Sequence, residues 1–350
     1  MEPLRIVVVG CGTMGSSHAR AYARMDGFAL AGLVDRRVEK AKSLSEEVGG
    51  VPLYSSLEDA IRLGRLDAAS ICTHPDSHHA LTLKALRAGL HLFVEKPLAT
   101  SVEEAEEIAE LAAQKQKKVV VGYILRHHPA WQRFVEEARA LGKPLVMRMN
   151  LNQQSSGTEW FVHKKLMDSL SPIVDCGVHY VDVMCQMTRS RPLRVQAIGA
   201  RLTEEIRESM YNYGQLQVVF EDGSVGWYEA GWGPMMSETA YFVKDVIGPR
   251  GCVSIAEPRP DAGTGSSDID SHTKTSLLIK HDAGTMQDVR IDTSDEPGHQ
   301  ALCDREQEYF LRAIREDMDL REHLRDAVNS LRIVLAADRS VRTGTIVHLP

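Results

Sequence analysis

One short segment of the chain carries the residue types that proton transfer requires. Asp175, His179 and Asp182 have the spacing i, i+4 and i+7, which would place them on one face of a helix opening at Asp175. A histidine can take the proton of a hydroxyl group near neutral pH, and a carboxylate one turn away can orient the ring and raise its basicity. The structural alternative is an aspartate that caps the helix, followed by a core histidine whose hydrogen bonds are satisfied.

Lys96 is a second candidate for chemistry. It follows an expected strand at residues 91–94 and lies between Glu95 and Pro97, and the proline restricts the turn. At the carboxyl edge of a nucleotide-binding sheet, this lysine would point toward a cofactor. The alternative is a solvated surface lysine, which is the usual situation for this residue type.

A glycine loop near the N-terminus indicates the cofactor that these residues would serve. Residues 4–9 form an apolar run typical of a buried parallel strand, and a G-x-G-x-x-G segment follows. Gly10 permits the tight turn, Gly12 lets a pyrophosphate approach the backbone, and Gly15 lets the next helix pack closely. Asp35 ends the second strand, where its carboxylate can accept hydrogen bonds from a ribose. The cofactor-binding residues expected in this unit are Gly10, Gly12, Thr13, Met14, Gly15 and Asp35.

The residues after the second strand bear on the choice between NAD and NADP. Asp35 favours NAD, because its carboxylate would repel a 2′-phosphate. Arg36 and Arg37 follow directly, and either could pair with that phosphate. Alternatively, Arg36 and Arg37 are ordinary surface arginines at the start of a helix and do not contact the cofactor. We predict NAD, with use of NADP left open, and include Arg36 among the cofactor-binding residues.

Composition and charge argue against several other classes of protein. The chain has 350 residues, of which 43% are hydrophobic and 25% charged, as is ordinary for a globular protein of two domains. A net charge of -7 gives no indication of a nucleic-acid or anionic membrane surface. No apolar run reaches the ~20 residues that span a bilayer, and the first strand begins too early for a signal peptide. The six cysteines include no C-x-x-C pair, so we expect a cytoplasmic protein. From the charge and the lack of a long apolar run, we expect no nucleic-acid or membrane partner.

A metal centre is not expected. His74 and His78 have H-x-x-x-H spacing, but Pro75 disfavours helical geometry at His74, so the two rings would not share a helix face. The sequence has no H-E-x-x-H segment, and it also lacks the G-x-S-x-G elbow of a serine hydrolase. We therefore predict no metal site.

The order of the expected elements predicts an α/β fold. Strands and helices alternate as far as residue 122, as in a doubly wound parallel sheet, in which ligands bind beyond the carboxyl ends of the strands. Later runs between residues 144 and 291 favour a large, mostly antiparallel sheet, and residues 257–271 are the most loop-like. We expect a Rossmann domain at 1–123 and an α+β domain at 124–350. The helices expected in the second domain cover residues 129–141, 174–187, 300–314 and 321–343.

Four motifs in this order resemble the glucose–fructose oxidoreductase / inositol dehydrogenase (Gfo/Idh/MocA) family. They are the glycine loop at 10–15, Thr73 with His78 before a helix ending at Gly89, Glu95-Lys96-Pro97, and D-x-x-x-H-x-x-D at 175–182. Gly122-Tyr123 followed by Arg126 also resembles the family's segment at the domain junction. The resemblance covers essentially the whole chain. It implies a Rossmann domain and a second domain whose large open sheet commonly forms a dimer or tetramer interface.

The resemblance also implies roles for single residues. Lys96 would bridge cofactor and substrate and help to move the proton, His179 would be the acid/base, and Asp175 would contact substrate or orient the histidine. Pro97 often follows a cis peptide bond in relatives. The implied activity is hydride transfer between a nicotinamide cofactor and a secondary hydroxyl of a sugar, sugar derivative or inositol. The matching segments extend the expected cofactor-binding residues to Thr73, His74, His78, Glu95, Lys96 and Arg126.

The chain departs from the family pattern on the presumed substrate side. His74 stands where proline is common, Ile124 where asparagine is common, and residues 169–172 replace a glycine-rich stretch. These changes leave the particular substrate open. An aromatic face with flanking donors suits a polyol, although packing or a solvated loop is the alternative for each such residue. The expected substrate-binding residues are Tyr123, Trp160, Lys164, Asp175 and His179, with His163, Lys165, Asp168 and Trp232 as further candidates.

Two other functions stay open at this point. Some relatives oxidise a sugar hydroxyl transiently, eliminate the aglycone and return the hydride, so that no net NADH forms. A nucleotide-binding sensor without catalysis is the other alternative. The joint presence of Lys96, Asp175 and His179 argues against it, because a sensor needs no set of proton-transfer residues.

Overall fold

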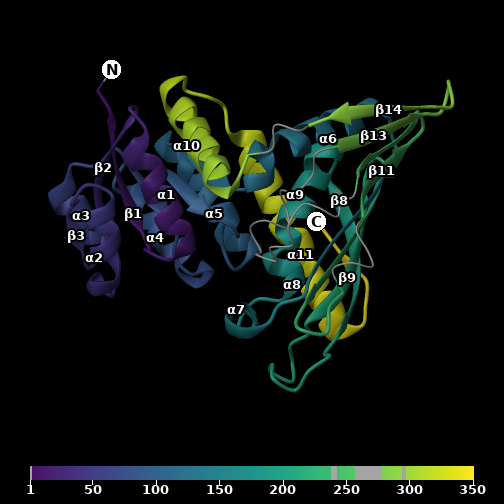
Figure 1. Cartoon of the computed structure of the whole chain (residues 1–350), viewed down its shortest axis with the longest axis horizontal. Coiled ribbons are helices and arrows are strands. Elements are labelled where there is room, and N and C mark those ends of the chain that lie inside the picture. Colours follow the sequence, from purple (N-terminus) through teal and green to yellow (C-terminus); the bar gives the residue numbers. More distant parts are fainter. Residues whose placement is uncertain (1, 238–242, 257–276, 294–296) are drawn as a thin grey trace. The chain divides into compact units, whose positions relative to one another are not determined.

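The computed structural model describes residues 2–237, 243–256, 277–293 and 297–350 (Figure 1). The chain divides into two compact units. The first consists of residues 1–124 and 300–328, and the second of residues 125–299 and 329–350. The expected loop-like segment 257–271 and the first residues of an expected strand at 240–247 lie outside the described residues.

A six-stranded parallel sheet forms the first unit, in the order β3-β2-β1-β4-β5-β6. This is the order of a Rossmann sheet, with the reversal between β1 and β4. The strands are β1 (Leu4–Val9), β2 (Phe28–Val34), β3 (Leu53–Tyr54), β4 (Ala68–Ile71), β5 (His91–Glu95) and β6 (Val119–Gly122). The helices between them are α1 (Thr13–Arg24), α2 (Val38–Glu47), α3 (Leu57–Gly64), α4 (His78–Arg87) and α5 (Val102–Lys115).

Local signals in the sequence account for the ends of several of these helices. The Ser56 hydroxyl accepts a hydrogen bond from the backbone N–H of Asp59 and caps α3. Ser101 and Glu104 form a reciprocal capping box at the start of α5. Gly89 has a φ of 83°, which favours glycine where the chain leaves α4. These ends fix the lengths of the crossovers that return the chain to the sheet.

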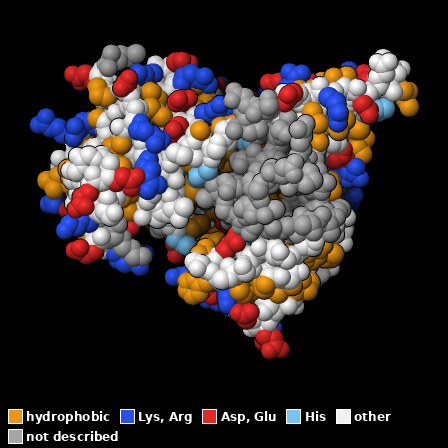
Figure 2. All heavy atoms as spheres, viewed as in Figure 1, with side chains coloured by type: hydrophobic (Ala, Val, Ile, Leu, Met, Phe, Trp, Pro, Cys, Tyr) orange, Lys and Arg blue, Asp and Glu red, His pale blue; other side chains and the backbone are white. Residues whose placement is uncertain are grey.

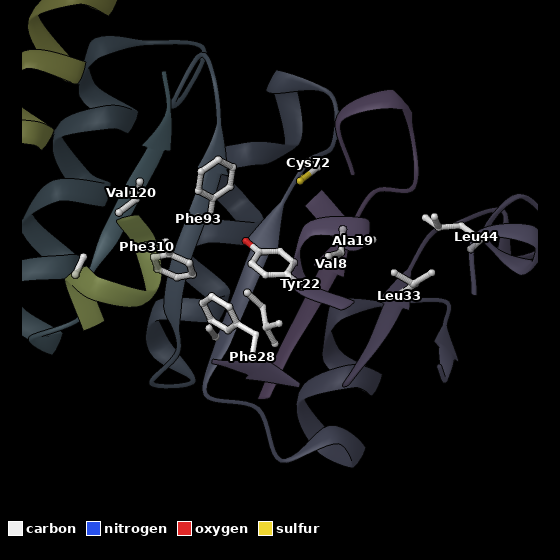
Figure 3. Packing of buried hydrophobic residues seen from close by; sticks show 14 of the residues in the cluster. Val8, Ala19, Tyr22, Phe28, Leu33, Leu44, Cys72, Phe93, Val120 and Phe310 are labelled. Carbon is white, nitrogen blue, oxygen red and sulfur yellow. The ribbon is translucent and has the colours of Figure 1, made fainter. Parts of the chain in front are cut away.

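A late helix completes the core of the first unit. Phe310 of α10 (His299–Arg315) has no exposed surface, and its ring stacks on Phe28 of β2 with centroids 5.9 Å apart. Figure 3 shows Phe310 among the buried side chains of the sheet, close to Phe93 and Val120. Residues 300–328 therefore belong with the first unit and not, as predicted, with the second. Their apolar face covers rings that the N-terminal segment alone would leave exposed to water.

The second unit is built on a nine-stranded sheet in the order β14-β13-β12-β11-β7-β10-β9-β8-β15. All neighbours are antiparallel except β7 and β10, so the expectation of a mostly antiparallel sheet is confirmed. The first strands are β7 (Val146–Gln153), β8 (Pro192–Ala200), β9 (Tyr213–Phe220), β10 (Val225–Trp232) and β11 (Lys244–Gly248). The remaining strands are β12 (Gly251–Ile255), β13 (Leu277–Asp282), β14 (Gln287–Asp292) and β15 (Val347–His348).

The helices of the second unit differ from the expectation in two places. The helix expected at 174–187 starts earlier and comes as two segments, and residues 157–166, treated as a substrate-contacting stretch, form a helix that was not predicted. The helices are α6 (Pro129–Ala140), α7 (Gly157–Leu166), α8 (Pro172–Asp175), α9 (Gly177–Thr188) and α11 (Arg321–Thr343), whose first residues belong to the first unit. Helix α9 packs on α6 and on β7 and β10.

The surface carries charges of both signs. On the visible face of the first unit, lysine and arginine side chains are interspersed with aspartate and glutamate (Figure 2). No helix within the described part of the chain is long and apolar enough to cross a membrane.

Candidate active site

The glycine loop after β1 has the shape that a dinucleotide requires. A Cβ on Gly15 would lie 1.8 Å from the Gly10 carbonyl oxygen, and a Cβ on Gly10 would lie 2.6 Å from the Cys72 carbonyl oxygen. A Cβ on Gly12 would meet nothing within 4 Å. Gly10 and Gly15 therefore serve the packing of the chain, whereas Gly12 leaves open space beside the N-terminus of α1. Among the residues that the structure describes, no side chain caps this N-terminus, so its backbone N–H groups can serve a phosphate.

Asp35 is tied to the glycine loop. One of its carboxylate oxygens accepts the Cys11 backbone N–H at 3.0 Å, and the other accepts the Arg37 N–H at 2.8 Å. Each oxygen keeps a lone pair for a ribose hydroxyl. Burial, followed by the charge of Asp35, raises the pKa of the Cys11 thiol to about 12, so this thiol stays protonated. Arg36 and Arg37 are exposed.

The loops after β4 and β5 are joined by a histidine. The fully buried His78 ring places Nδ1 2.8 Å from the Pro97 carbonyl oxygen and Nε2 3.0 Å from the Thr73 carbonyl oxygen. Burial lowers the pKa of His78, and the two carbonyl contacts oppose that shift. The Lys96–Pro97 bond is cis, as the family resemblance implied. Thr73 accepts a hydrogen bond from Ser77, and His74 is exposed beside Asp76.

Glu95 and Lys96 occupy the end of β5. Glu95 is buried, and its carboxylate contacts the His18 Nε2 at 2.7 Å and the Lys96 backbone N–H at 3.1 Å. Burial opposes the ionisation of Glu95, but the hydrogen bond and the charge of His18, followed by the charge and the backbone N–H of Lys96, outweigh it and lower the pKa of Glu95. Glu95 is therefore an anion directed at the lysine that follows it.

Asp175 and His179 lie on consecutive helical segments of the second unit. Ser171, and not Asp175, opens this region, because the Ser171 hydroxyl accepts the Val174 N–H and caps α8. Asp175 ends α8, Cys176 joins the segments, and His179 lies in the first turn of α9. Both Asp175 and His179 are buried. Two tyrosine rings stacked 4.9 Å apart, Tyr180 and Tyr228, hold α9 on the sheet.

Arg126 and Asp182 form a bidentate ion pair within the second unit. The Arg126 Nε lies 2.8 Å from one carboxylate oxygen of Asp182, and a terminal guanidinium nitrogen lies 2.5 Å from the other. The Asp182 carboxylate also accepts the Gln186 side-chain amide at 3.0 Å. Both partners are largely buried. Asp182 was considered as a partner of His179 and Arg126 as a cofactor contact, but these two residues bind each other.

Most of the candidate substrate contacts are buried. Trp160 has 6% of its surface exposed, and His163 stacks on the buried Trp232 with ring centroids 4.4 Å apart. Lys164 lies 5.5 Å from the Trp160 ring centroid and pairs with Glu205. Of the remaining candidates, Tyr123 is fully buried at the end of β6, Lys165 is exposed, and Asp168 is exposed beside Arg207.

The sequence analysis missed several residues that hold these groups. The Gln153 side-chain oxygen accepts the Trp232 indole N–H at 2.6 Å and lies 3.6 Å from the sulfur of Cys176, the residue that follows Asp175. The Ser171 hydroxyl donates to Asp338 of α11 at 2.6 Å. His18 was not among the residues singled out from the sequence. These partners are many residues apart in the chain, so no local spacing could have identified them.

Two family models match the chain. Residues 4–123 match the oxidoreductase family with an NAD-binding Rossmann fold, and residues 133–251 match the GFO/IDH/MocA C-terminal domain. The chain belongs to the Gfo/Idh/MocA oxidoreductase family. The predicted family, the Rossmann fold and the assignment to an NAD-binding class are thus confirmed.

Individual members of the family are similar to this chain to different extents. The chain is 30% identical to UDP-N-acetylglucosamine 3-dehydrogenase of Acidithiobacillus ferrooxidans over 57% of its own length and 59% of that protein. It is 26% identical to the scyllo-inositol 2-dehydrogenase (NAD(+)) of Bacillus subtilis over 99% of its length and 96% of that protein. An oxidoreductase of Agrobacterium radiobacter, solved with NAD⁺, L-tartaric acid and magnesium, has the same fold, with a TM-score of 0.80 at 17% identity over 99% and 98% of the two chains.

Proposed function

We propose that this protein is an NAD-dependent dehydrogenase that oxidises a secondary hydroxyl group of a sugar, a sugar derivative or an inositol. The observation that carries the proposal is the glycine loop, in which Gly12 faces open space and Asp35 is bonded to the loop itself. This arrangement suits a dinucleotide whose ribose carries a free 2′-hydroxyl. Lys96, Asp175 and His179 supply a proton-transfer set in the same chain.

The chain's own residues would divide the work as follows. NAD, when bound, supplies the acceptor for the hydride. The backbone N–H groups at the start of α1 would hold its phosphates, and Asp35 its ribose. A ring nitrogen of His179 would take the proton from the substrate hydroxyl oxygen, and Asp175 would contact substrate or orient the ring. The Lys96 ammonium group would help to move the proton, the role that the family resemblance implies for it.

Two of the expected cofactor contacts are better assigned to positioning. His78 is fully buried and bonds the loops after β4 and β5, so we propose that it sets the distance between Thr73 and Pro97. Arg126 binds Asp182 on α9, so we propose that it fixes the helix that carries His179. Thr73, His74 and the main chain of these loops stay candidates for direct cofactor contact.

A homodimer or homotetramer is proposed as the working form. Val146, Val225 and Ile247 are exposed and adjacent in register on three neighbouring strands of the large sheet. An exposed apolar row on a sheet is typical of a subunit interface. We also propose that the protein works in the cytoplasm, where its six free cysteines would stay reduced.

A nicotinamide turnover assay tests the proposed function. The purified protein is incubated with NAD or NADP and inositols, aldoses, sugar acids or glycosides, and nucleotide that co-purifies is identified after denaturation. We expect reduced nicotinamide to accumulate with one class of polyol and with NAD. Release of aglycone without NADH would instead indicate a redox-neutral glycoside-cleaving enzyme. Nucleotide binding without turnover of any compound would contradict the dehydrogenase and favour a sensor.

A further inference from the structure

A buried polar cluster lies behind the Glu95-Lys96-Pro97 segment, entirely within the first unit. Glu95 of β5 contacts the Nε2 of His18, a residue of α1, at 2.7 Å. The other ring nitrogen of His18 lies 2.9 Å from the side-chain amide nitrogen of Gln307 in α10. The Gln307 amide oxygen accepts the Tyr22 hydroxyl at 2.5 Å. Three elements that are far apart in the sequence thus meet through a continuous row of hydrogen bonds.

This row defines where the protons lie. The Gln307 oxygen accepts the Tyr22 hydroxyl, so its NH₂ group faces His18 and donates to Nδ1. The other ring nitrogen, Nε2, contacts the Glu95 carboxylate, so both ring nitrogens of His18 have a hydrogen-bond partner.

Glu306 is a second carboxyl group in the same cluster. It has 1% of its surface exposed, and neither of its oxygens has a hydrogen-bond partner within the described part of the chain. One of its oxygens, a ring nitrogen of His18 and the Cys303 sulfur all lie within 4.8 Å of one another. An ionised carboxylate without a donor in such a place would be very costly, and a second anion at Glu95 adds repulsion.

We propose that Glu306 holds a proton and acts as a positioning residue for Lys96, because its neutral carboxyl group leaves Glu95 as the single buried anion of the cluster. That anion accepts the Lys96 backbone N–H and faces the lysine charge. If Glu306 ionised, two carboxylates would compete inside one dry cluster, and Glu95 would protonate or move away from Lys96. The link to Lys96 chemistry rests on the proposed dehydrogenase function, whereas the protonation of Glu306 does not.

The surroundings agree with a neutral Glu306. Burial is the largest cause that raises the pKa of Glu306 well above its usual value, and the charge of Glu95 adds to it. A metal ion bound by His18, Cys303 and Glu306 is disfavoured, because both ring nitrogens of His18 already contact Glu95 and Gln307. The titratable groups that face Glu306 are His18 and Tyr22 of α1, Cys72 after β4, Glu95 of β5 and Cys303 of α10. Lys96 acts on Glu95, and Asp304 acts on Cys303.

The pH dependence of stability tests the proton on Glu306 without any substrate. Folding raises the pKa of this carboxyl group above the ordinary value of 4.5, so its contribution to stability is complete below pH 4.5 and is lost as pH rises toward the folded pKa. Glu306→Gln cannot ionise. We expect the Tm of Glu306→Gln to exceed that of the wild type at pH 8 and the difference to shrink steadily toward pH 5. Glu308→Gln, at an exposed site of the same helix, is the matched control, and its Tm should equal that of the wild type at both pH values.

Two further measurements complete the test. Infrared spectra at pH 7 should contain the carbonyl stretch of a protonated carboxyl group in the wild type and in Glu308→Gln, and lack it in Glu306→Gln. The alkaline loss of kcat/KM should move to higher pH in Glu306→Gln, which a purely structural role would not produce. A Tm difference independent of pH, absence of the infrared band in the wild type, or stoichiometric bound metal would overturn the proton on Glu306. An unchanged pH profile beside the expected Tm and infrared results would overturn the link to Lys96.

Discussion

The cofactor edge of the first unit and the helices α8 and α9 of the second unit hold their candidate residues by different means. At the cofactor edge, Asp35 and His78 bond to backbone groups of neighbouring loops. On the helices of the second unit, Asp182 and Ser171 bond to distant side chains, Arg126 and Asp338. Backbone groups are present whatever the sequence, so the first arrangement needs only one particular residue per contact. The second needs two, and it can be altered by substitution without changing the fold.

His179 should show the largest effect, because it is the residue through which the second unit would act on the substrate. We expect His179→Ala to lower kcat/KM by about 10²–10⁴-fold, while NAD affinity and Tm stay close to the wild type. His348→Ala, at an exposed strand position of the same unit, is the matched control. Retention of most of the kcat/KM would contradict the acid/base role of His179, and helices α8 and α9 would then carry no residue shown to act in catalysis.

The Arg126–Asp182 pair tests whether distant side chains stabilise the second unit. Arg126→Ala leaves the buried Asp182 carboxylate without its cation, so we expect a loss of about 3–5 kcal/mol in the free energy of unfolding. Arg191→Ala, which breaks an exposed pair with Glu221, should cost less than about 1 kcal/mol. Urea denaturation and NAD titration are measured on both variants. A loss of NAD affinity with unchanged stability would return Arg126 to the cofactor-binding residues.

Gly12 and Gly15 separate cofactor contact from packing within one loop. A methyl group at Gly15 would meet the Gly10 carbonyl oxygen, so Gly15→Ala should cost about 1–3 kcal/mol of stability. Gly12→Ala meets no protein atom, so its Tm should stay unchanged while the Kd for NAD rises about tenfold or more. Calorimetry with and without NAD distinguishes a loss of stability from a loss of NAD affinity. Equal Tm losses would show that the loop tolerates no Cβ at either position.

Asp35 should show the smallest effect. Asp35→Asn keeps an oxygen for the Cys11 N–H but removes the charge that would repel a 2′-phosphate, so kcat/KM with NADP should rise relative to NAD by about tenfold. The ratio of the two kcat/KM values in the wild type and the variant is the measurement. Equal values in the wild type would refute a strict preference for NAD.

The first unit could be predicted because its signals are local. The G-x-G-x-x-G segment and the Ser101–Glu104 capping box each lie within six residues, and the strand expected at residues 4–9 is β1. Asp35 could be placed by its distance from the glycine loop. The contacts of His18 with Glu95 and Gln307 join residues 77 and 289 positions apart, and no periodicity reports such distances.

Helix α7 shows why the second unit was harder to predict. Its buried side chains are Trp160 and His163, whereas Phe161 and Val162 are 63% and 48% exposed. A polar residue on the buried face and apolar residues on the exposed face hide the helical period. The break between α8 and α9 at Cys176 was likewise hidden, because residues 174–187 were predicted as one helix.

The return of the chain to the first unit has a consequence for its synthesis. Phe310 and Ala313 of α10 belong to the core that Phe28 and Phe93 begin. A ribosome adds roughly 5–20 residues per second, so the N-terminal sheet waits on the order of ten seconds or more for its last core residues. During that interval its apolar face needs another cover, such as a chaperone. A fragment ending near residue 123 would keep that face exposed and should aggregate, whereas a fusion of residues 1–124 to residues 300–328 would supply the missing helix.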